Sequence, residues 1–369
     1  MKYLSFLIKP ASSLCNMRCK YCFYYDVSEL REIKSYGIMQ EEVYQKLIDR
    51  SLSYQNGKTF VSYAFQGGEP TMAGLSFFKN FCGYVDSKKQ PNQEVKYAIQ
   101  TNGYRLNEEW VAFFKEKSFL VGISLDGYKE NHDFFRLNKE QKSTFERVMQ
   151  SISLLKQYQV DYNILCVLTN TLAKHPLKLY RFFKDNTFDY VQLIPCLPEL
   201  KESKNTKNKF ALTPKMFASF YKQFFRLWLK DLKQGDYMSV TLFDNLIPMF
   251  KGIPPMQCGM LGFCSAQFVI EANGNVYPCD FYVLDQYKIG NIIENSIDEL
   301  YQSPIVKEFL SQEKRMCKDK EKCKYYTICQ GNCKRLNITY FDDNGYCGYQ
   351  DFLDTHYQAM IEIVKATMR

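Results

Sequence analysis

The stretch Cys15–Cys22 reads CNMRCKYC and lies a few residues after YLSFLIKP (3–10), an apolar segment with the composition of a first β-strand. Its cysteines have the spacing C-x3-C-x2-C, for which about 0.02 chance matches are expected at this cysteine frequency. Three thiolates on one loop satisfy three irons of a cubane and leave the fourth iron open. A zinc site would need a fourth ligand, and no histidine lies near. The loop is therefore a candidate site for an iron-sulfur cluster with one open iron.

The rest of the composition is that of a folded protein of the cytoplasm. The 369 residues are 46% apolar and 24% charged, and 14 of them are cysteines. The first apolar run is too short for a signal peptide, and no stretch approaches a membrane span, so we expect a cytoplasmic protein without membrane contact. In that compartment disulfides are rare, and metal binding is the commoner use of many cysteines.

Charge excludes one class of partner. The formal net charge is +8, but the lysines are scattered, apart from KESKNTKNK at 201–209, which we expect to be a solvated loop. Nucleic-acid binding needs a basic stripe or a known binding fold, and the sequence has neither. We therefore expect no nucleic-acid partner.

Apolar β-type runs alternate with amphipathic helical stretches up to about residue 195. The expected strands are LSFLIK, FVSYAFQ, VKYAIQT, FLVGISL, YNILCVLT and YVQLIP, and the expected helices between them include QEEVYQKLIDRSLSY and TFERVMQSISLLKQY. Strict alternation predicts an α/β fold with a parallel sheet, and six such units fit a partial (β/α)6 barrel. Chemistry in such barrels gathers where strands end, and there the sequence has GGEP, QTNG and SLDG.

The pattern changes after about residue 235, so we expect a barrel at 1–235 and a small cysteine-rich domain at 236–369. In FVIEANGNVYPC, Asn-Gly between two β-type runs predicts a hairpin, and residues 350–368 have the pattern of a closing helix. Eight cysteines lie between 258 and 347. The remaining three, Cys82, Cys166 and Cys196, lie in helix or strand patterns and are expected to be buried apolar residues.

CNMRCKYC, with Tyr21 before its last cysteine, and GGEP at 67–70 together resemble the radical S-adenosylmethionine (SAM) superfamily. The resemblance implies that Cys15, Cys19 and Cys22 hold a [4Fe-4S] cluster whose open iron binds SAM. It also implies a SAM pocket lined by Tyr21, Gln66, Gly67, Gly68, Glu69, Ser124, Asp126 and Arg147. For Arg147, on a helical face, a solvated side chain is the alternative.

The eight later cysteines resemble the SPASM extension of radical SAM enzymes, which implies two further [4Fe-4S] clusters, three in all. Auxiliary cluster I would use Cys258, Cys264, Cys279 and Cys333. Auxiliary cluster II would use Cys317, Cys323, Cys329 and Cys347. The family usually has C-x2-C where this chain has CKDKEKC, and the longer loop puts Cys317 in doubt. Two zinc sites are the alternative use of the octet.

LIKPASSLCNMRCKYCFY, SYGIM, FQGGEPTMAG and QFVIEANGNVYPCDFYVL resemble anaerobic sulfatase-maturating enzymes, which oxidise a cysteine or serine of an unfolded sulfatase segment to Cα-formylglycine. The resemblance implies Asp280, next to Cys279, as the base and Tyr24 as a residue on the substrate side. From the residues alone, Asp280 is as readily a hairpin-end carboxylate bonded to backbone amides, and Tyr24 a packing residue.

Two other functions stay open. A maturase of another ribosomal peptide, forming a thioether crosslink or epimerising a residue, is the first, although many of these carry an extension before the first strand. An iron-sulfur or zinc protein without catalysis is the second, but an open iron gives a carrier no advantage. As partners we expect a sulfatase or other peptide and a low-potential flavodoxin- or ferredoxin-type donor, with the chain as a monomer.

Overall fold

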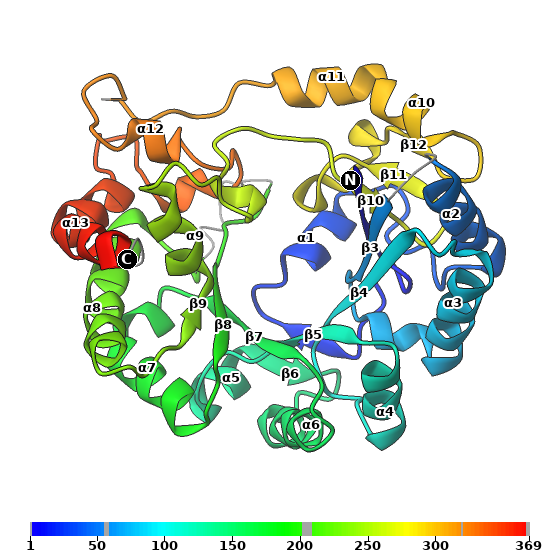
Figure 1. The fold of residues 1–369 in the computed structure, drawn as a ribbon, viewed down its shortest axis with the longest axis horizontal. Helices are drawn as coiled ribbons and strands as arrows, with labels where there is room; N and C mark the ends of the chain where they lie inside the picture. Colours follow the sequence, from blue (N-terminus) through cyan, green and yellow to red (C-terminus); the bar gives the residue numbers. More distant parts are fainter. Residues whose placement is uncertain (1, 55–58, 201–208, 319, 367–369) are drawn as a thin grey trace. The chain divides into compact units, whose positions relative to one another are not determined.

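The computed structural model describes residues 2–54, 59–200, 209–318 and 320–366 (Figure 1). The chain forms two compact units. The first combines Met1–Ser124, Asp133–Tyr162 and Ser265–Gln312, and the second combines Leu125–His132, Asn163–Cys264 and Glu313–Arg369. Each unit contains residues from before and from after residue 235. The two expected domains, 1–235 and 236–369, therefore stay a prediction. The expected solvated loop lies outside the described residues, apart from Lys209.

Four predicted strands form the parallel core of the first unit. They are β1 (Lys2–Ile8), β3 (Thr59–Phe65), β4 (Gln93–Thr101) and β5 (Phe119–Ser124), hydrogen-bonded in that order. The register places Leu4 beside Val61, and Val61 beside Val95. Alternate side chains such as Leu4 and Phe6 are buried, as the period of a strand requires. All four strand ends therefore meet at one edge of the sheet.

The predicted hairpin extends this sheet on its other side. Strands β10 (Phe268–Ile270) and β11 (Asn275–Tyr277) are antiparallel, and Gly274 in their turn has φ +85°, which favours glycine. Strand β10 pairs in parallel with β1, Phe6 beside Phe268, and β12 (Gly290–Asn291) follows β11. The hairpin is confirmed, and its pairing places β1 between β3 and β10, which was not predicted.

Helices of the first unit cover this sheet with aromatic faces. They are α2 (Glu41–Ser53), α3 (Leu75–Lys88), α4 (Glu108–Glu116) and α6 (Phe145–Gln157), with α10 (Ile297–Gln302) and α11 (Pro304–Ser311) later in the chain. Helices α2 and α3 lie side by side (Figure 1). Phe78 and Phe81 of α3 pack on Phe65 of β3, with ring centroids 5.0 and 5.1 Å apart. The two helices predicted between strands, α2 and α6, are confirmed.

The second unit contains the last two predicted strands. Strand β7 (Tyr162–Leu168) pairs in parallel with β8 (Tyr190–Pro195), which pairs with the unpredicted β9 (Ser239–Val240). The long helices α8 (Pro214–Lys233) and α13 (Gly348–Ala366) lie together, with Phe225 and Phe352 at 6.0 Å between ring centroids. Four further helices follow β5 in the chain: α5 (Lys129–Phe135), α7 (Pro176–Asp185), α9 (Thr241–Met249) and α12 (Tyr326–Cys329).

Candidate active site

Two short elements hold the cysteine triad. Strand β2 (Met17–Cys19) pairs antiparallel with β6 (Arg136–Asn138), so Cys19 lies beside Arg136. Helix α1 (Phe23–Glu29) begins directly after Cys22, whose sulfur accepts a 3.4 Å hydrogen bond from the Tyr25 amide. The Cys15 sulfur accepts one of 3.3 Å from the Met17 amide. Backbone amides thus face two of the three thiols, as they do around clusters held by thiolates.

The donor set fits an iron-sulfur cluster. Burial, together with the nearby Glu69 and Cys22, raises the pKa of the Cys15 thiol to about 11. Within the described ranges, no three His, Cys, Asp or Glu side chains are gathered as on a single metal ion. A cubane spreads its thiolates over several irons, so three half-buried thiols on one loop suit it. The ligand role of the triad stays a prediction.

The GGEP loop packs against the residues that lead into the triad. The Gly68 amide donates to the Ser12 carbonyl at 2.9 Å, and the Glu69 amide donates to the Leu14 carbonyl at 2.8 Å. A Cβ atom on Gly68 would lie 2.3 Å from the Leu14 carbonyl oxygen, so only glycine fits there. Gly67 has φ +127°, and a Cβ atom there would lie 3.2 Å from the Cβ of Lys9, a tight but less severe contact. The motif therefore sets the path of the triad loop, and its predicted contact with SAM stays a prediction.

The Glu69 carboxylate ties two strand ends together. It is 1% exposed and accepts hydrogen bonds from the amide and hydroxyl of Thr71, at 3.0 and 2.7 Å. It also accepts from the Thr101 hydroxyl and the Asn102 amide, both at 2.7 Å. The Asn102 side chain in turn donates to Oδ1 of Asn16 at 2.8 Å, inside the triad loop. With four donors around it, this buried carboxylate is fully satisfied.

Asp280 is held by two side chains of neighbouring strand ends. The 3-10 helix η4 (Asp280–Tyr282) begins directly after Cys279. The Lys9 ammonium lies 2.5 Å from Oδ1 of Asp280, and the Gln66 amide donates to Oδ2 at 2.9 Å. The Lys9 side chain is 1% exposed and that of Asp280 is 19% exposed. Gln66, predicted in the SAM pocket, thus faces Asp280, which is oriented through both oxygens.

The triad loop and Asp280 lie next to each other within the first unit. Helix α1 contacts η4, and the Phe23 and Phe281 rings meet edge to face with centroids 5.4 Å apart. Each of these elements begins directly after a predicted cluster ligand, Cys22 in one case and Cys279 in the other. This contact therefore holds the triad loop close to the segment that carries Cys279 and Asp280.

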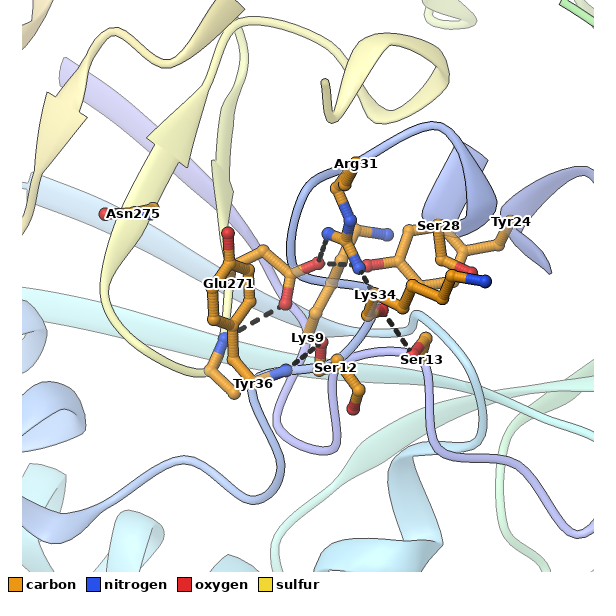
Figure 2. Close-up of polar contacts among 12 residues, drawn as sticks. Lys9, Ser12, Ser13, Tyr24, Ser28, Arg31, Lys34, Tyr36, Glu271 and Asn275 are labelled. Atoms are coloured by element: carbon orange, nitrogen blue, oxygen red, sulfur yellow. Dashed lines mark hydrogen bonds and ion pairs between the residues drawn. The ribbon is translucent and has the colours of Figure 1, made fainter. Parts of the chain in front are cut away.

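A buried charge cluster supports this arrangement (Figure 2). The Arg31 guanidinium lies 2.5 Å from Glu271, both side chains are 0% exposed, and the Tyr24 hydroxyl donates to the same carboxylate. Burial and Glu271 raise the pKa of Tyr24 well above its ordinary value, so the phenol keeps its proton. The Lys9 ammonium lies 3.9 Å from the Tyr24 ring centroid. Tyr24 thus packs beneath Lys9, and its predicted role toward substrate stays a prediction.

Other predicted pocket residues of the first unit have defined partners. The Tyr21 hydroxyl accepts a 3.0 Å hydrogen bond from Arg136, beside the triad. Arg147 donates through Nε to the Tyr104 carbonyl at 3.2 Å and through Nη2 to another carbonyl of the loop after β4. It is therefore not a free solvated arginine. Ser124 lies half-buried at the end of β5.

Asp126 belongs to the second unit. Its carboxylate is 0% exposed and accepts a 3.0 Å hydrogen bond from the Val167 amide, at the end of β7. The Asn131 side chain donates to the Asp126 carbonyl at 2.8 Å. These contacts fix the loop after β5, while its part in a SAM pocket stays a prediction.

The second unit brings the auxiliary II cysteines together around one cavity. Its lining includes Cys317, Cys323, Cys329 and Cys347. Burial, together with the three nearby thiols of the group, raises the pKa of Cys329 to about 11. The five-residue spacer therefore does not remove Cys317 from the group. Four thiols around one cavity suit a closed cluster, although their ligand roles stay a prediction.

Three of the four auxiliary I cysteines also gather in the second unit. Burial raises the pKa of Cys258, with Cys333 and Cys264 adding to the effect. The Cys333 amide donates to the Gly259 carbonyl at 2.9 Å, which ties the two segments together. Cys279 belongs to the first unit, so its place in this cluster stays a prediction. Cys82, Cys166 and Cys196 are buried, as expected.

Sequence reasoning gave no individual role to four polar residues of the site: Lys9, Arg31, Asn102 and Glu271. Three of them directly follow a strand, Lys9 after β1, Asn102 after β4 and Glu271 after β10. That position at the ends of parallel strands is the signal that could have identified them. Arg31 follows no strand and carries no comparable signal.

Two protein-family models match this chain. Residues 10–183 match the model of the Radical SAM superfamily, and residues 262–334 match that of an iron-sulfur cluster-binding domain. In the part of the chain that the structure covers, no helix is both long and apolar enough to cross a membrane.

Relatives match over nearly the whole chain. The cysteine-type anaerobic sulfatase-maturating enzyme of Clostridium novyi (strain NT) is 42% identical, over 99% of this chain and 98% of its own length. The cysteine-type enzyme of Clostridium perfringens (strain 13 / Type A) is 40% identical, over 98% and 99%. The serine-type enzyme of Bacteroides thetaiotaomicron is 31% identical, over 90% and 83%.

A solved structure shares the fold. Native anSMEcpe with bound AdoMet and Cp18Cys peptide has a TM-score of 0.90 and 38% identity, over 99% of each chain. The expected α/β radical SAM fold, with a parallel sheet followed by an iron-sulfur cluster-binding domain, is thereby confirmed. Full-length identity and a common fold have one consequence: this chain belongs to the family of anaerobic sulfatase-maturating enzymes, within the radical SAM superfamily.

Proposed function

We propose that the chain oxidises a cysteine of an unfolded sulfatase polypeptide to Cα-formylglycine, with Asp280 as the base that takes the proton of the target side chain. One observation carries the proposal. The triad loop and Asp280 lie in one compact unit, where α1 and η4 meet through Phe23 and Phe281 at 5.4 Å between ring centroids. A base next to the predicted SAM cluster is what this oxidation needs.

The residues of the chain position the base. When bound, SAM and the triad cluster would supply the radical that removes a hydrogen atom from Cβ, and the auxiliary clusters would supply an electron acceptor. Loss of one further electron and of the thiol proton then gives a thioaldehyde. Water replaces its sulfur, which leaves as hydrogen sulfide, and the aldehyde of formylglycine results. The Asp280 side chain is 19% exposed, so a substrate can reach it, while Lys9 and Gln66 each hold one of its oxygens. Its carboxylate is therefore oriented before a peptide binds.

Three [4Fe-4S] clusters are proposed. Cys15, Cys19 and Cys22 would hold the first, and the quartet around the cavity of the second unit would hold auxiliary cluster II. The third would be auxiliary cluster I, with Cys258, Cys264, Cys279 and Cys333. Four thiols that meet at one cavity support auxiliary cluster II, because a closed cluster takes four thiolates.

Cysteine is the proposed target because the cysteine-type relatives, at 42% and 40% identity, are more similar than the serine-type one, at 31%. For anSMEcpe, solved structures hold AdoMet with the Cp18Cys and Kp18Cys peptides. A low-potential flavodoxin- or ferredoxin-type protein is the proposed electron donor. The proposed location is the cytoplasm, where thiols stay reduced, with the chain as a monomer.

The test is an anaerobic reaction of the reconstituted chain with SAM, a strong reductant and two peptides that differ only in cysteine or serine at the target. Mass spectrometry would quantify formylglycine and 5′-deoxyadenosine. We expect both products with the cysteine peptide. If 5′-deoxyadenosine forms while both peptides stay unchanged, the sulfatase substrate is wrong and another ribosomal peptide becomes the candidate.

A further inference from the structure

The Lys314 side chain, in the second unit, is hydrogen-bonded to three backbone carbonyl groups. Its Nζ atom donates to the carbonyl oxygens of Gly262, Gln330 and Asn332, the last at 3.2 Å. An ammonium group has three N–H donors, so three carbonyl acceptors match its capacity. The side chain is half-buried, and its charge is therefore held in one place instead of moving through solvent.

Each of these carbonyl groups lies in a segment that carries a predicted cluster ligand. Gly262 precedes Cys264 by two residues, and Asn332 directly precedes Cys333, both predicted in auxiliary cluster I. Gln330 directly follows Cys329, predicted in auxiliary cluster II. A single cation therefore connects the ligand segments of both clusters.

The segment between Cys329 and Cys333 has an unusual backbone. Gln330, Gly331 and Asn332 all have positive φ, at 43°, 76° and 51°. Gln330 and Asn332 bear side chains, which rarely adopt this left-handed region, so the turn needs support from its surroundings. Lys314 supplies this support, because it donates hydrogen bonds to the carbonyl groups of Gln330 and Asn332 in the turn. The turn separates two cysteines that belong to different predicted clusters.

The loop that contains Gly262, whose carbonyl also accepts a hydrogen bond from Lys314, is closely packed. Gly262 has φ +79°, and a Cβ atom there would lie 2.4 Å from the Cβ of Gln330. The loop that leads to Cys264 therefore presses directly on the left-handed turn. Lys314 joins these two closely packed segments through one atom.

The Lys314 ammonium lies close enough to thiols of both predicted auxiliary clusters to interact with their charge. Burial lowers the pKa of Lys314, while Cys264, Cys329 and Cys333 act to raise it because all three lie close. A [4Fe-4S] cluster held by four thiolates is anionic, and reduction adds negative charge. Charges and hydrogen bonds around a cluster set its potential. A fixed cation here would favour the reduced form of either cluster.

We propose that Lys314 is a positioning residue shared by both auxiliary clusters: it holds the left-handed turn between Cys329 and Cys333, and its charge raises the reduction potential of the bound clusters. This inference rests on the auxiliary ligand sets of the proposed function. It gives a role to a lysine that is neither the proposed base nor part of the cysteine triad.

The experiment uses the full chain with Cys15, Cys19 and Cys22 all changed to alanine, so that all bound iron belongs to the auxiliary sites. In this background, Lys314→Met keeps the length of the side chain and removes its charge and donors. Lys322→Met, at an exposed lysine next to Cys323, is the matched control. Iron and sulfide per chain and the midpoint potential are measured anaerobically.

We expect Lys314→Met to lower the iron content, and the clusters that remain to have a lower midpoint potential, while Lys322→Met changes neither. Iron content and potential equal to the background protein would overturn the proposal. If Lys314→Met fails to fold, Lys314→Gln keeps hydrogen-bond donors without the charge, and an unchanged potential in that variant would be equally decisive. Zinc in place of iron in the background protein would instead overturn the auxiliary clusters themselves, and this inference with them.

Discussion

The Lys9 ammonium donates a 2.5 Å hydrogen bond to Oδ1 of Asp280, across 271 positions of the chain. The lysine follows the first strand, and the aspartate follows the hairpin that pairs with that strand. Because the Lys9 side chain is 1% exposed, its charge has little contact with water and depends on the carboxylate. The pair therefore joins the proposed base to the core of the first unit.

Asp280→Asn is expected to abolish formylglycine formation without abolishing SAM cleavage. Asparagine keeps the shape of the side chain but cannot take up a proton, so the product should fall roughly 10²- to 10⁴-fold. The measurement is formylglycine and 5′-deoxyadenosine from the same anaerobic reaction. Asp285→Asn, at the next aspartate along the chain, is the control and should keep both products. Normal formylglycine yield from Asp280→Asn would remove this residue as the base.

Lys9→Met is expected to uncouple the two products. Without the ammonium, the Asp280 carboxylate keeps only the Gln66 contact and loses its fixed orientation. A misplaced base can lower the rate by up to about 100-fold, mainly in kcat. The ratio of formylglycine to 5′-deoxyadenosine should therefore fall, with little change in KM for the peptide.

The matched control for this lysine is Lys178→Met. Lys178 also lies over an aromatic ring, 3.7 Å from the Tyr128 centroid, and also pairs with a carboxylate, but at an exposed position. It should leave the product ratio unchanged. An equal fall in both variants would mean that lost packing, not the position of Asp280, lowers the ratio.

Glu271→Gln is expected to destabilise the fold by about 3–5 kcal/mol, because it leaves the buried Arg31 charge without its partner. Chemical denaturation followed by circular dichroism measures the free energy of unfolding. The double variant Arg31→Met/Glu271→Leu removes both charges and should recover much of the loss. Glu109→Gln breaks an exposed pair with Lys79 and should cost less than about 1 kcal/mol. Equal effects at both sites would contradict the importance of burial.

Gly68→Ala is expected to impair the triad. The new Cβ would lie 2.3 Å from the Leu14 carbonyl oxygen, so the loop that carries Cys15 must move. Iron content and SAM cleavage should both fall. Gly83→Ala is the control, because Gly83 lies inside α3 with nothing within 4 Å of a new Cβ. That change should stabilise the protein by up to about 1 kcal/mol. Normal iron loading in Gly68→Ala would show that the close contact can relax.

Local patterns predicted the fold where each element is long enough to show its period. Six strands, helices α2 and α6, the closing helix α13 and the Asn273-Gly274 hairpin turn were found in this way. Strands β2 and β6 have three residues each, too few for a periodic signal, and were missed. The pairing of β10 with β1 was missed because residues so far apart in sequence leave no local trace of their contact.

The site followed the same division. Asp280 and Gln66 came from motifs, and the structure places them in contact. Lys9 and Glu271 lie in stretches that carry the resemblance, but neither was singled out, because charged residues are usually exposed. Their burial is set by partners elsewhere in the chain: Asp280 for Lys9, and Arg31 with Tyr24 for Glu271. Burial of charge therefore became visible only with the fold.

The position of β1 between β3 and β10 also bears on how the protein is made. A ribosome releases Phe6 early and its partner Phe268 only after most of the chain has been synthesised. Until then one edge of β1 has no strand beside it, and unpaired strand edges invite pairing with other chains. The Cys15–Cys22 loop follows this unfinished edge directly. Iron insertion into the triad is thus expected to come after translation has passed the hairpin, with the nascent chain protected by a chaperone until that point.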